Sequence, residues 1–141
     1  KGEAYSYTFT SSVFSSNSTK ALGGLNWTVA GDGGYWGWDS QNGKGQQFGS
    51  AGKPYKALTI STEDYTEGVE TIKLTTSGAS STNAKVEVYV GGVKLGQTTN
   101  LTTSSTEHEF SNNGEILTGK IEIKYTQTSS KAIYLKAIKI N

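Results

Sequence analysis

The sequence predicts an all-β protein, an antiparallel β-sandwich of jelly-roll type with about eight or nine strands. Three observations lead to this class. Gly, Ser, Thr and Asn are abundant and only 33% of the residues are apolar, a composition that favours strands and turns over helices. Several short segments alternate between apolar and polar residues, which is the period of a half-buried strand. Turn-forming residues separate these segments at intervals of roughly 8–12 residues, as in known sandwiches.

The first half of the chain holds five segments of this kind. In residues 5–9 (YSYTF) three aromatic side chains share one face of the predicted strand. In residues 25–29 (LNWTV) the same alternation places Trp27 beside two aliphatic residues, which predicts that Trp27 belongs to the core. The other predicted strands of this half are residues 46–49, 57–61 and 69–75.

The clearest pattern is a hairpin in residues 84–96 (AKVEVYVGGVKLG). Three valines face one way and polar or aromatic residues face the other. Gly91 and Gly92 separate the two strands and can adopt the positive φ angles that a two-residue hairpin turn requires.

The end of the chain predicts a second antiparallel pair. Residues 120–125 (KIEIKY) and 132–140 (AIYLKAIKI) alternate, and the polar loop 126–131 joins them. Within the last segment the apolar residues change phase half-way, which predicts a β-bulge near Lys136 or Ala137.

Composition limits both the organisation and the partners of the protein. A chain of 141 residues suits one domain, so we expect residues 1–141 to be a single monomeric module excised from a larger protein. A net charge of +1 without any Arg argues against nucleic acid as a partner. Without Cys there is neither a disulfide nor a thiolate site, and no apolar run is long enough for membrane insertion.

Residues suited to catalysis are few. The only histidine, His108, lies between two glutamates in an alternating segment, and we expect it on the surface. Two carboxylates could serve glycoside hydrolysis, either Asp32 with Asp39 or the acids within residues 63–67. Neither set has a neighbour that would separate the two pKa values, so we predict that the protein is not an enzyme.

Binding of a hard metal ion is a stronger alternative than catalysis. The oxygen atoms of Glu3, Asp32, Asp39 and Asn42 are of the type that Ca²⁺ prefers. The spacing does not match an EF-hand loop. We therefore expect that no cofactor is required, and binding of a structural Ca²⁺ remains the alternative.

The glycine-rich stretch 31–45, GDGGYWGWDSQNGKG, contains two of the three tryptophans. If residues 35–39 are extended, Trp36 and Trp38 project from one face about 6 to 7 Å apart. Two such indoles could stack on sugar rings while nearby polar groups bind the hydroxyls. The alternative is that the tryptophans close the end of the sandwich beneath a loop. The candidate sugar-binding residues are Asp32, Tyr35, Trp36, Trp38, Asp39, Gln41, Lys44 and Gln47.

Nearly the whole chain resembles a known type of module. The segments LNWTVAGDGGYWGWDSQNGKGQQFGS, VGG and GKIEIKYTQTSSKAIYLKAIKI are similar to non-catalytic β-sandwich modules of secreted or surface proteins of gut and rumen bacteria, which resemble carbohydrate-binding modules. The resemblance implies an extracellular location, covalent neighbour domains and a polysaccharide ligand. It implies starch-type α-1,4-glucan first, then β-glucan or xylan, and it makes residues 44–49 and 131–138 scaffold. The alternative function is a structural or adhesive spacer domain that binds protein or nothing.

Overall fold

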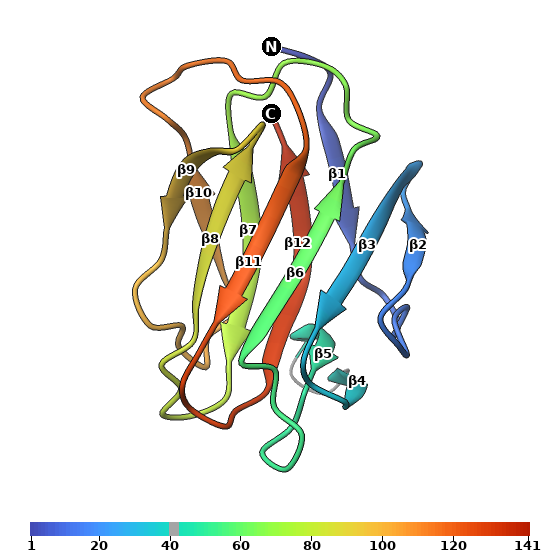
Figure 1. Ribbon diagram of the computed structural model, residues 1–141, viewed down its shortest axis with the longest axis vertical. Coiled ribbons are helices and arrows are strands. Elements are labelled where there is room, and N and C mark those ends of the chain that lie inside the picture. Colours follow the sequence, from blue (N-terminus) through green and yellow to red (C-terminus); the bar gives the residue numbers. More distant parts are fainter. Residues whose placement is uncertain (40–42) are drawn as a thin grey trace.

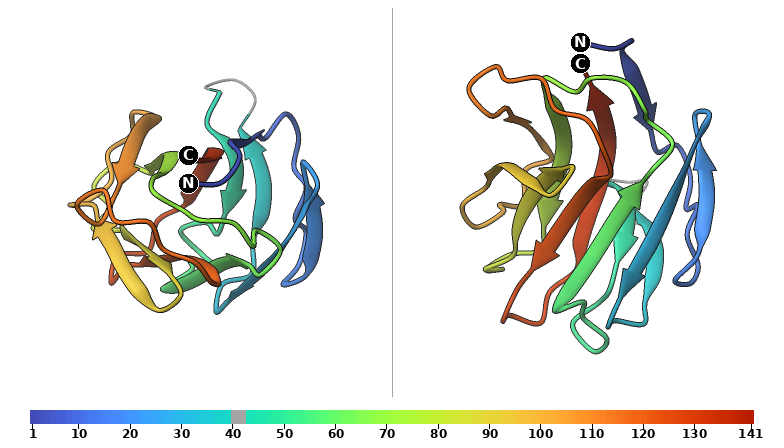
Figure 2. Two further views of the ribbon diagram at one scale, coloured as in Figure 1. Left: turned by 90° about the horizontal axis from the view of Figure 1, so that it is seen from above. Right: turned by 45° about the horizontal axis from the view of Figure 1, so that its top comes forward.

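The computed structural model describes residues 1–39 and 43–141, which form two packed antiparallel sheets (Figures 1 and 2). Sheet A has the strand order β10-β7-β12-β5-β4, with β1 also paired to β12. It contains β1 (Tyr5–Thr8), β4 (Trp36–Asp39), β5 (Gly45–Phe48), β7 (Ile72–Gly78), β10 (Thr106–Phe110) and β12 (Ile133–Ile140). Sheet B has the order β2-β3-β6-β11-β8-β9. It contains β2 (Thr19–Leu22), β3 (Leu25–Gly31), β6 (Ala57–Thr62), β8 (Lys85–Val90), β9 (Val93–Gln97) and β11 (Ile121–Thr126).

The predicted antiparallel sandwich is confirmed, with twelve strands among the described residues instead of eight or nine. Strands β2 and β10 were not predicted, and β4 was considered only on the condition that residues 35–39 are extended; all three lie at the edge of a sheet. An edge strand pairs on one side only and exposes much of its length, so its sequence needs little apolar alternation. Residues 1–39 and 43–141 contain no helix, and hence none that could span a membrane.

Two local predictions are confirmed. Strands β8 and β9 form the hairpin, and its turn residues Gly91 and Gly92 have φ angles of 57° and 80°. A side chain at position 91 would also collide with the Thr118 carbonyl oxygen, 2.3 Å from the Cβ position. The β-bulge lies between Leu135 and Ala137, where it restores the inward direction of the apolar residues after the change of phase.

The predicted pairing of the last two long strands is wrong. Strand β11 lies between β6 and β8 in sheet B, whereas β12 lies in sheet A and pairs with β7, β5 and β1. The connection between β11 and β12 therefore crosses from one sheet to the other. Gln127 stabilises this connection, because its buried side-chain amide donates hydrogen bonds of 2.8 Å to the Tyr55 and Lys131 backbone carbonyls.

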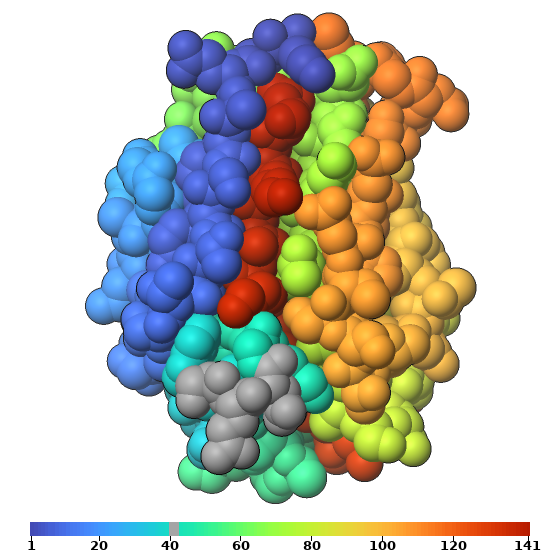
Figure 3. All heavy atoms as spheres, turned by 180° about the vertical axis from the view of Figure 1, so that it is seen from behind, coloured from blue at the N-terminus to red at the C-terminus, as the bar shows by residue number. Residues whose placement is uncertain are grey.

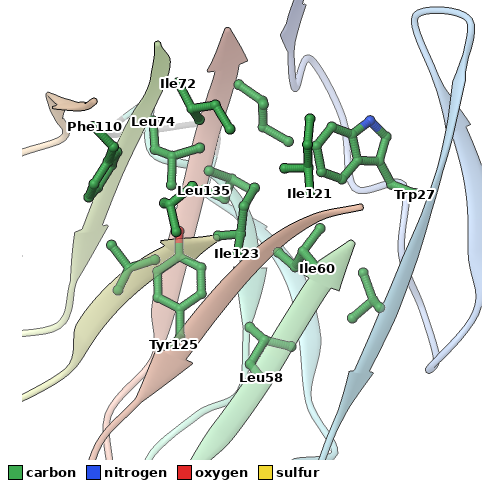
Figure 4. Packing of buried hydrophobic residues seen from close by; sticks show 14 of the residues in the cluster. Trp27, Leu58, Ile60, Ile72, Leu74, Phe110, Ile121, Ile123, Tyr125 and Leu135 are labelled. Carbon is green, nitrogen blue, oxygen red and sulfur yellow. The ribbon is translucent and has the colours of Figure 1, made fainter. Parts of the chain in front are cut away.

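The core lies between the two sheets and contains residues from both (Figure 4). Trp27 is fully buried, as predicted, and its indole N–H donates to the Tyr5 hydroxyl at 3.1 Å. The buried Tyr125 hydroxyl lies 2.8 Å from the Thr76 hydroxyl, which joins sheet B to sheet A through a polar contact. Burial raises the pKa of Tyr125 well above its ordinary value.

The two ends of the sandwich differ. Both chain termini lie at one end, which we call the termini end (Figure 1). There Asn141 donates to the Gly2 and Gly68 carbonyls at 3.2 and 2.9 Å. The β4–β5 hairpin lies at the opposite end, together with the connections into β6, β8 and β12, and we call this the hairpin end.

Candidate functional site

The glycines of the stretch 31–45 make room for a buried ring. Gly31 and Gly33 lie against Tyr55, so a Cβ atom at either position would be 2.6 or 2.5 Å from a ring carbon. Tyr55 is completely buried, and the rings of Trp36 and Phe48 meet it at near-perpendicular angles, with centroids 5.2 and 6.4 Å away. Residues 31–39 therefore pack over the hairpin end, and the close approach of Tyr55 explains the glycines at positions 31 and 33.

Trp36 and Trp38 project from the same face of β4, as predicted. Their partners across the strand pair are Phe48 and Gln46, both fully buried, so this face is the one turned toward the core. Trp36 packs edge-to-face on Phe48 with a centroid distance of 5.4 Å. Both indoles are half-buried against the core cluster. They therefore pack on the core side of the hairpin with part of each residue accessible, and their stacking on sugar rings stays a prediction.

A different aromatic group occupies the outer face of the same hairpin. One cross-strand row contains Gly37 on β4, Gln47 on β5 and Tyr134 on β12. The Tyr35 side chain covers Gly37, since a Cβ atom there would lie 3.0 Å from the Tyr35 ring. Tyr35 is 44% exposed, the largest exposure of any aromatic side chain that the structure describes. We call Tyr35, Asp39, Lys44, Gln47 and Tyr134 the tyrosine patch.

Charged groups border the tyrosine patch. The Lys44 ammonium lies 5.2 Å from the centre of the Tyr134 ring, a cation–π distance. Partial burial raises the pKa of Tyr134, and the nearby Asp39 and Tyr35 raise it further. Tyr134 therefore stays protonated at neutral pH, and its hydroxyl can both donate and accept a hydrogen bond.

The tyrosine patch lies on the outer face of sheet A, where Tyr35 is 44% exposed. Figure 3 shows this face, with β12 between β1 and β7 and part of the β4–β5 hairpin near its lower end. On this face Gly37, which the Tyr35 ring covers, and Tyr134 belong to strands two spacings apart, about 10 Å at the usual distance between neighbouring strands. Two tyrosines, an amide, an ammonium and a carboxylate can together stack on rings and bind hydroxyls.

Sequence reasoning assigned Tyr134 to the scaffold and missed it as a site residue. A signal was present, because Ile133 and Leu135 point inward and leave Tyr134 on the opposite face. What the sequence did not show is that β12 pairs with β5, which brings Tyr134 next to Gln47.

The other predicted ligand residues have different surroundings. Asp32 accepts hydrogen bonds from the Lys56 and Ala57 backbone N–H groups at 2.8 and 3.1 Å. Its carboxylate therefore connects the end of β3 to the start of β6. Gln41 and Asn42 lie outside the described residues. Asp39 belongs to the tyrosine patch, whereas Glu3 lies at the termini end.

A single metal site made of Glu3, Asp32 and Asp39 is wrong, because Glu3 and Asp32 lie at opposite ends of the sandwich. In the part of the chain that the structure describes, no three His, Asp or Glu side chains gather as they would around a metal ion.

The residues considered for catalysis do not converge either. Asp64 accepts a hydrogen bond from the Asn26 backbone at 2.8 Å and Glu67 accepts one from the Glu3 backbone at 3.3 Å, both at the termini end. His108 is half-buried at the edge strand β10, with its ring nitrogen 3.2 Å from the Thr106 hydroxyl. These side chains are parts of local hydrogen-bond networks.

Comparison with known proteins supports the fold. No family model and no curated protein matches the sequence. Among solved structures, the chain is similar to the carbohydrate-binding module CBM36 in complex with calcium and xylotriose, with 22% identity and a TM-score of 0.50 over 81% of this chain and 99% of that one. It is also similar to TmCBM61 in complex with β-1,4-galactotriose, with 17% identity and a TM-score of 0.58 over 82% and 87% of the two chains.

An enzyme also contains a similar fold. A family two carbohydrate esterase from Cellvibrio japonicus matches 98% of this chain with 12% identity and a TM-score of 0.52, but only 34% of the esterase chain is covered. At these identities the similarities establish a β-sandwich of the kind found in carbohydrate-binding modules. They do not identify the residues of a binding site in this chain.

Proposed function

We propose that this protein is a non-catalytic carbohydrate-binding module that holds a glycan chain against the tyrosine patch. The observation that carries the proposal is the exposed Tyr35 ring, which covers Gly37 in the cross-strand row with Gln47 and Tyr134 on the outer face of sheet A. An aromatic ring left in water on a regular strand pair suits stacking against the C–H face of a pyranose. Trp36 and Trp38 support the hairpin from the core side.

The ligand we infer is a polysaccharide chain that runs across the strands. The two strand spacings between Gly37 and Tyr134, about 10 Å, are comparable to the length of a disaccharide, so the two tyrosines could contact alternate sugar residues. Starch-type α-1,4-glucan, β-glucan and xylan are the candidates. Two similar folds bind xylotriose and β-1,4-galactotriose, which supports including these sugars in the first panel.

The proposal also sets the context of the module. A shallow site with two stacked rings leaves little free energy after the cost of association, so we expect weak binding at each site. Useful avidity would come from covalent neighbour domains, with this monomeric module secreted or attached to a cell surface. A structural Ca²⁺ is not needed for the patch to bind sugar.

A spacer domain is the second candidate, and one observation favours it. Ile116 and Val93 are 52% and 41% exposed; Ile116 lies in the connection between β10 and β11 and Val93 is the first residue of β9, both at the termini end, where a neighbouring domain would attach. A spacer would pack these residues against its neighbour and would leave the tyrosine patch without a ligand.

Isothermal titration calorimetry with neutral and acidic oligosaccharides distinguishes the two functions. We expect saturable binding to one class, weakened roughly tenfold by Tyr35→Ala and by Tyr134→Ala. Tyr89→Ala is the matched control, because Tyr89 lies half-buried on the outer face of sheet B. Circular dichroism verifies that each variant is folded. If no oligosaccharide binds, the spacer function replaces this proposal; if a sugar binds but neither patch variant changes its affinity, the tyrosine patch is not the binding site.

A further inference from the structure

Charge is separated along the sandwich. The ion pairs that the structure describes neutralise the glutamates on the sheet faces, for example Glu87 with Lys94 at 3.3 Å and Glu107 with Lys139 at 3.3 Å. Most of the carboxylates outside these ion pairs lie at the termini end, in residues 63–67 and at Glu3 and Glu115. The faces are therefore balanced, and the termini end is acidic.

The hairpin end is basic. It carries six lysines but only two carboxylates, those of Asp32 and Asp39. The ion pairs among the described residues include none of these six lysines. Asp32 is already engaged with two backbone N–H groups. The lysines are Lys44, Lys53, Lys56, Lys85, Lys131 and Lys136.

Three of these lysines surround the β4–β5 hairpin. Lys44 lies over Tyr134, with its ammonium 5.2 Å from the ring centre. The Lys136 ammonium lies 5.9 Å from the centre of the Trp38 ring and near the hairpin turn, 3.9 Å from the Cβ position of Gly43. The stem of Lys53 approaches Gly34, the neighbour of Tyr35, at 3.4 Å from its Cβ position. Asp39 is the carboxylate that acts on Tyr134 in the same area.

We propose that the tyrosine patch selects an acidic glycan, one that carries uronate carboxylates. This inference rests on the proposed function and adds the charge of its ligand. Stacking on Tyr35 and Tyr134 would place a sugar ring beside Lys44, and Lys136 would meet a carboxylate farther along the chain. An ammonium is a compact charge without the fixed two-pronged geometry of a guanidinium, so the preference is graded and sensitive to salt.

Matched ligand pairs test the proposal on the whole chain. One pair is an oligogalacturonate and its methyl ester, and the other is a xylo-oligosaccharide with and without glucuronate. We expect the acidic member of a pair to bind roughly fivefold more tightly or better at low salt, because each exposed ammonium–carboxylate contact contributes a few-fold. Lys44→Gln and Lys136→Gln should each reduce this preference, measured as the ratio of the two affinities within a pair, by roughly two- to threefold. Lys139→Gln is the control, because Lys139 lies on the same sheet but is paired with Glu107.

Each outcome has a separate meaning. Equal binding of the acidic and neutral members, or a preference that survives in the double lysine variant, overturns the acidic selection and leaves the proposed function intact. Polyglutamate that binds as tightly as the acidic sugar, and is insensitive to Tyr35→Ala, also overturns it, because the site would then attract any polyanion. If no sugar binds at all, the proposed function itself fails. A preference for the acidic member that becomes smaller when the salt concentration is raised from about 0.02 to about 0.5 M supports the proposal.

Discussion

Replacing Gln46 with leucine tests how the hairpin end is held together. Gln46 is fully buried on β5, and its side-chain carbonyl accepts hydrogen bonds from the Val13 and Phe14 backbone N–H groups at 2.7 and 3.0 Å. Its amide nitrogen lies 3.2 Å from the Phe14 and Gly37 carbonyls. One side chain thus joins the segment after β1 to the hairpin that presents Tyr35.

The expected loss of stability follows from these contacts. Leucine leaves the buried Phe14 N–H and the partly buried Val13 N–H without their acceptor, at a cost of about 1–3 kcal/mol each. Burial of the apolar leucine side chain offsets about 1–2 kcal/mol of this. We therefore expect Gln46→Leu to reduce the free energy of unfolding by about 2–4 kcal/mol.

Urea denaturation followed by fluorescence measures this loss, and Gln47→Leu is the control. Gln47 is the next residue, is only half-buried and donates a single hydrogen bond of 3.0 Å to the Gly49 carbonyl. With a slope of about 1–3 kcal/mol/M, the midpoint of Gln46→Leu should fall by about 1–2 M. If the free energies of unfolding of the two variants differ by less than about 0.5 kcal/mol, the argument from buried hydrogen bonds is refuted.

Three further predictions concern the glycines and tyrosines. Gly33→Ala should destabilise the fold by about 1–3 kcal/mol in the same denaturation assay, because its methyl group would lie 2.5 Å from the Tyr55 ring; an unchanged midpoint would contradict this packing. Gly37→Ala should weaken glycan binding measured by calorimetry while the melting temperature changes little, because Tyr35 is exposed and has to move away from the new methyl group. Burial raises the pKa of Tyr5 and of Tyr55 from 10.0 to about 12, so the folded state holds these protons more tightly. Their contribution to the free energy of unfolding should be complete below about pH 10 and be lost as the pH rises toward 12. The urea midpoint of Tyr5→Phe should therefore fall less between these pH values than that of the unchanged protein.

The candidate site was only partly predictable. The sequence identified the stretch that forms it, including Tyr35, Asp39, Lys44 and Gln47, because aromatic and polar residues among glycines are unusual on a strand. It also placed Trp36 and Trp38 on one face, which the pairing with Phe48 and Gln46 confirms. The alternation could not show which face of β4 meets water. That depends on Tyr55, which lies outside the hairpin and packs against Trp36 and Phe48 on its inner side.

Local patterns alone determined the class of fold, most of the strands, the Gly91–Gly92 turn and the bulge beside Lys136. Each of these depends on φ angles or on the direction of side chains within a few residues, which the sequence encodes directly. Only the tertiary structure decided that β11 and β12 lie in different sheets and that Tyr134 joins the tyrosine patch. A hairpin within one sheet and a crossing between two sheets bury the same alternating residues, so the choice between them comes from contacts distant in sequence, such as Gln127 with Tyr55.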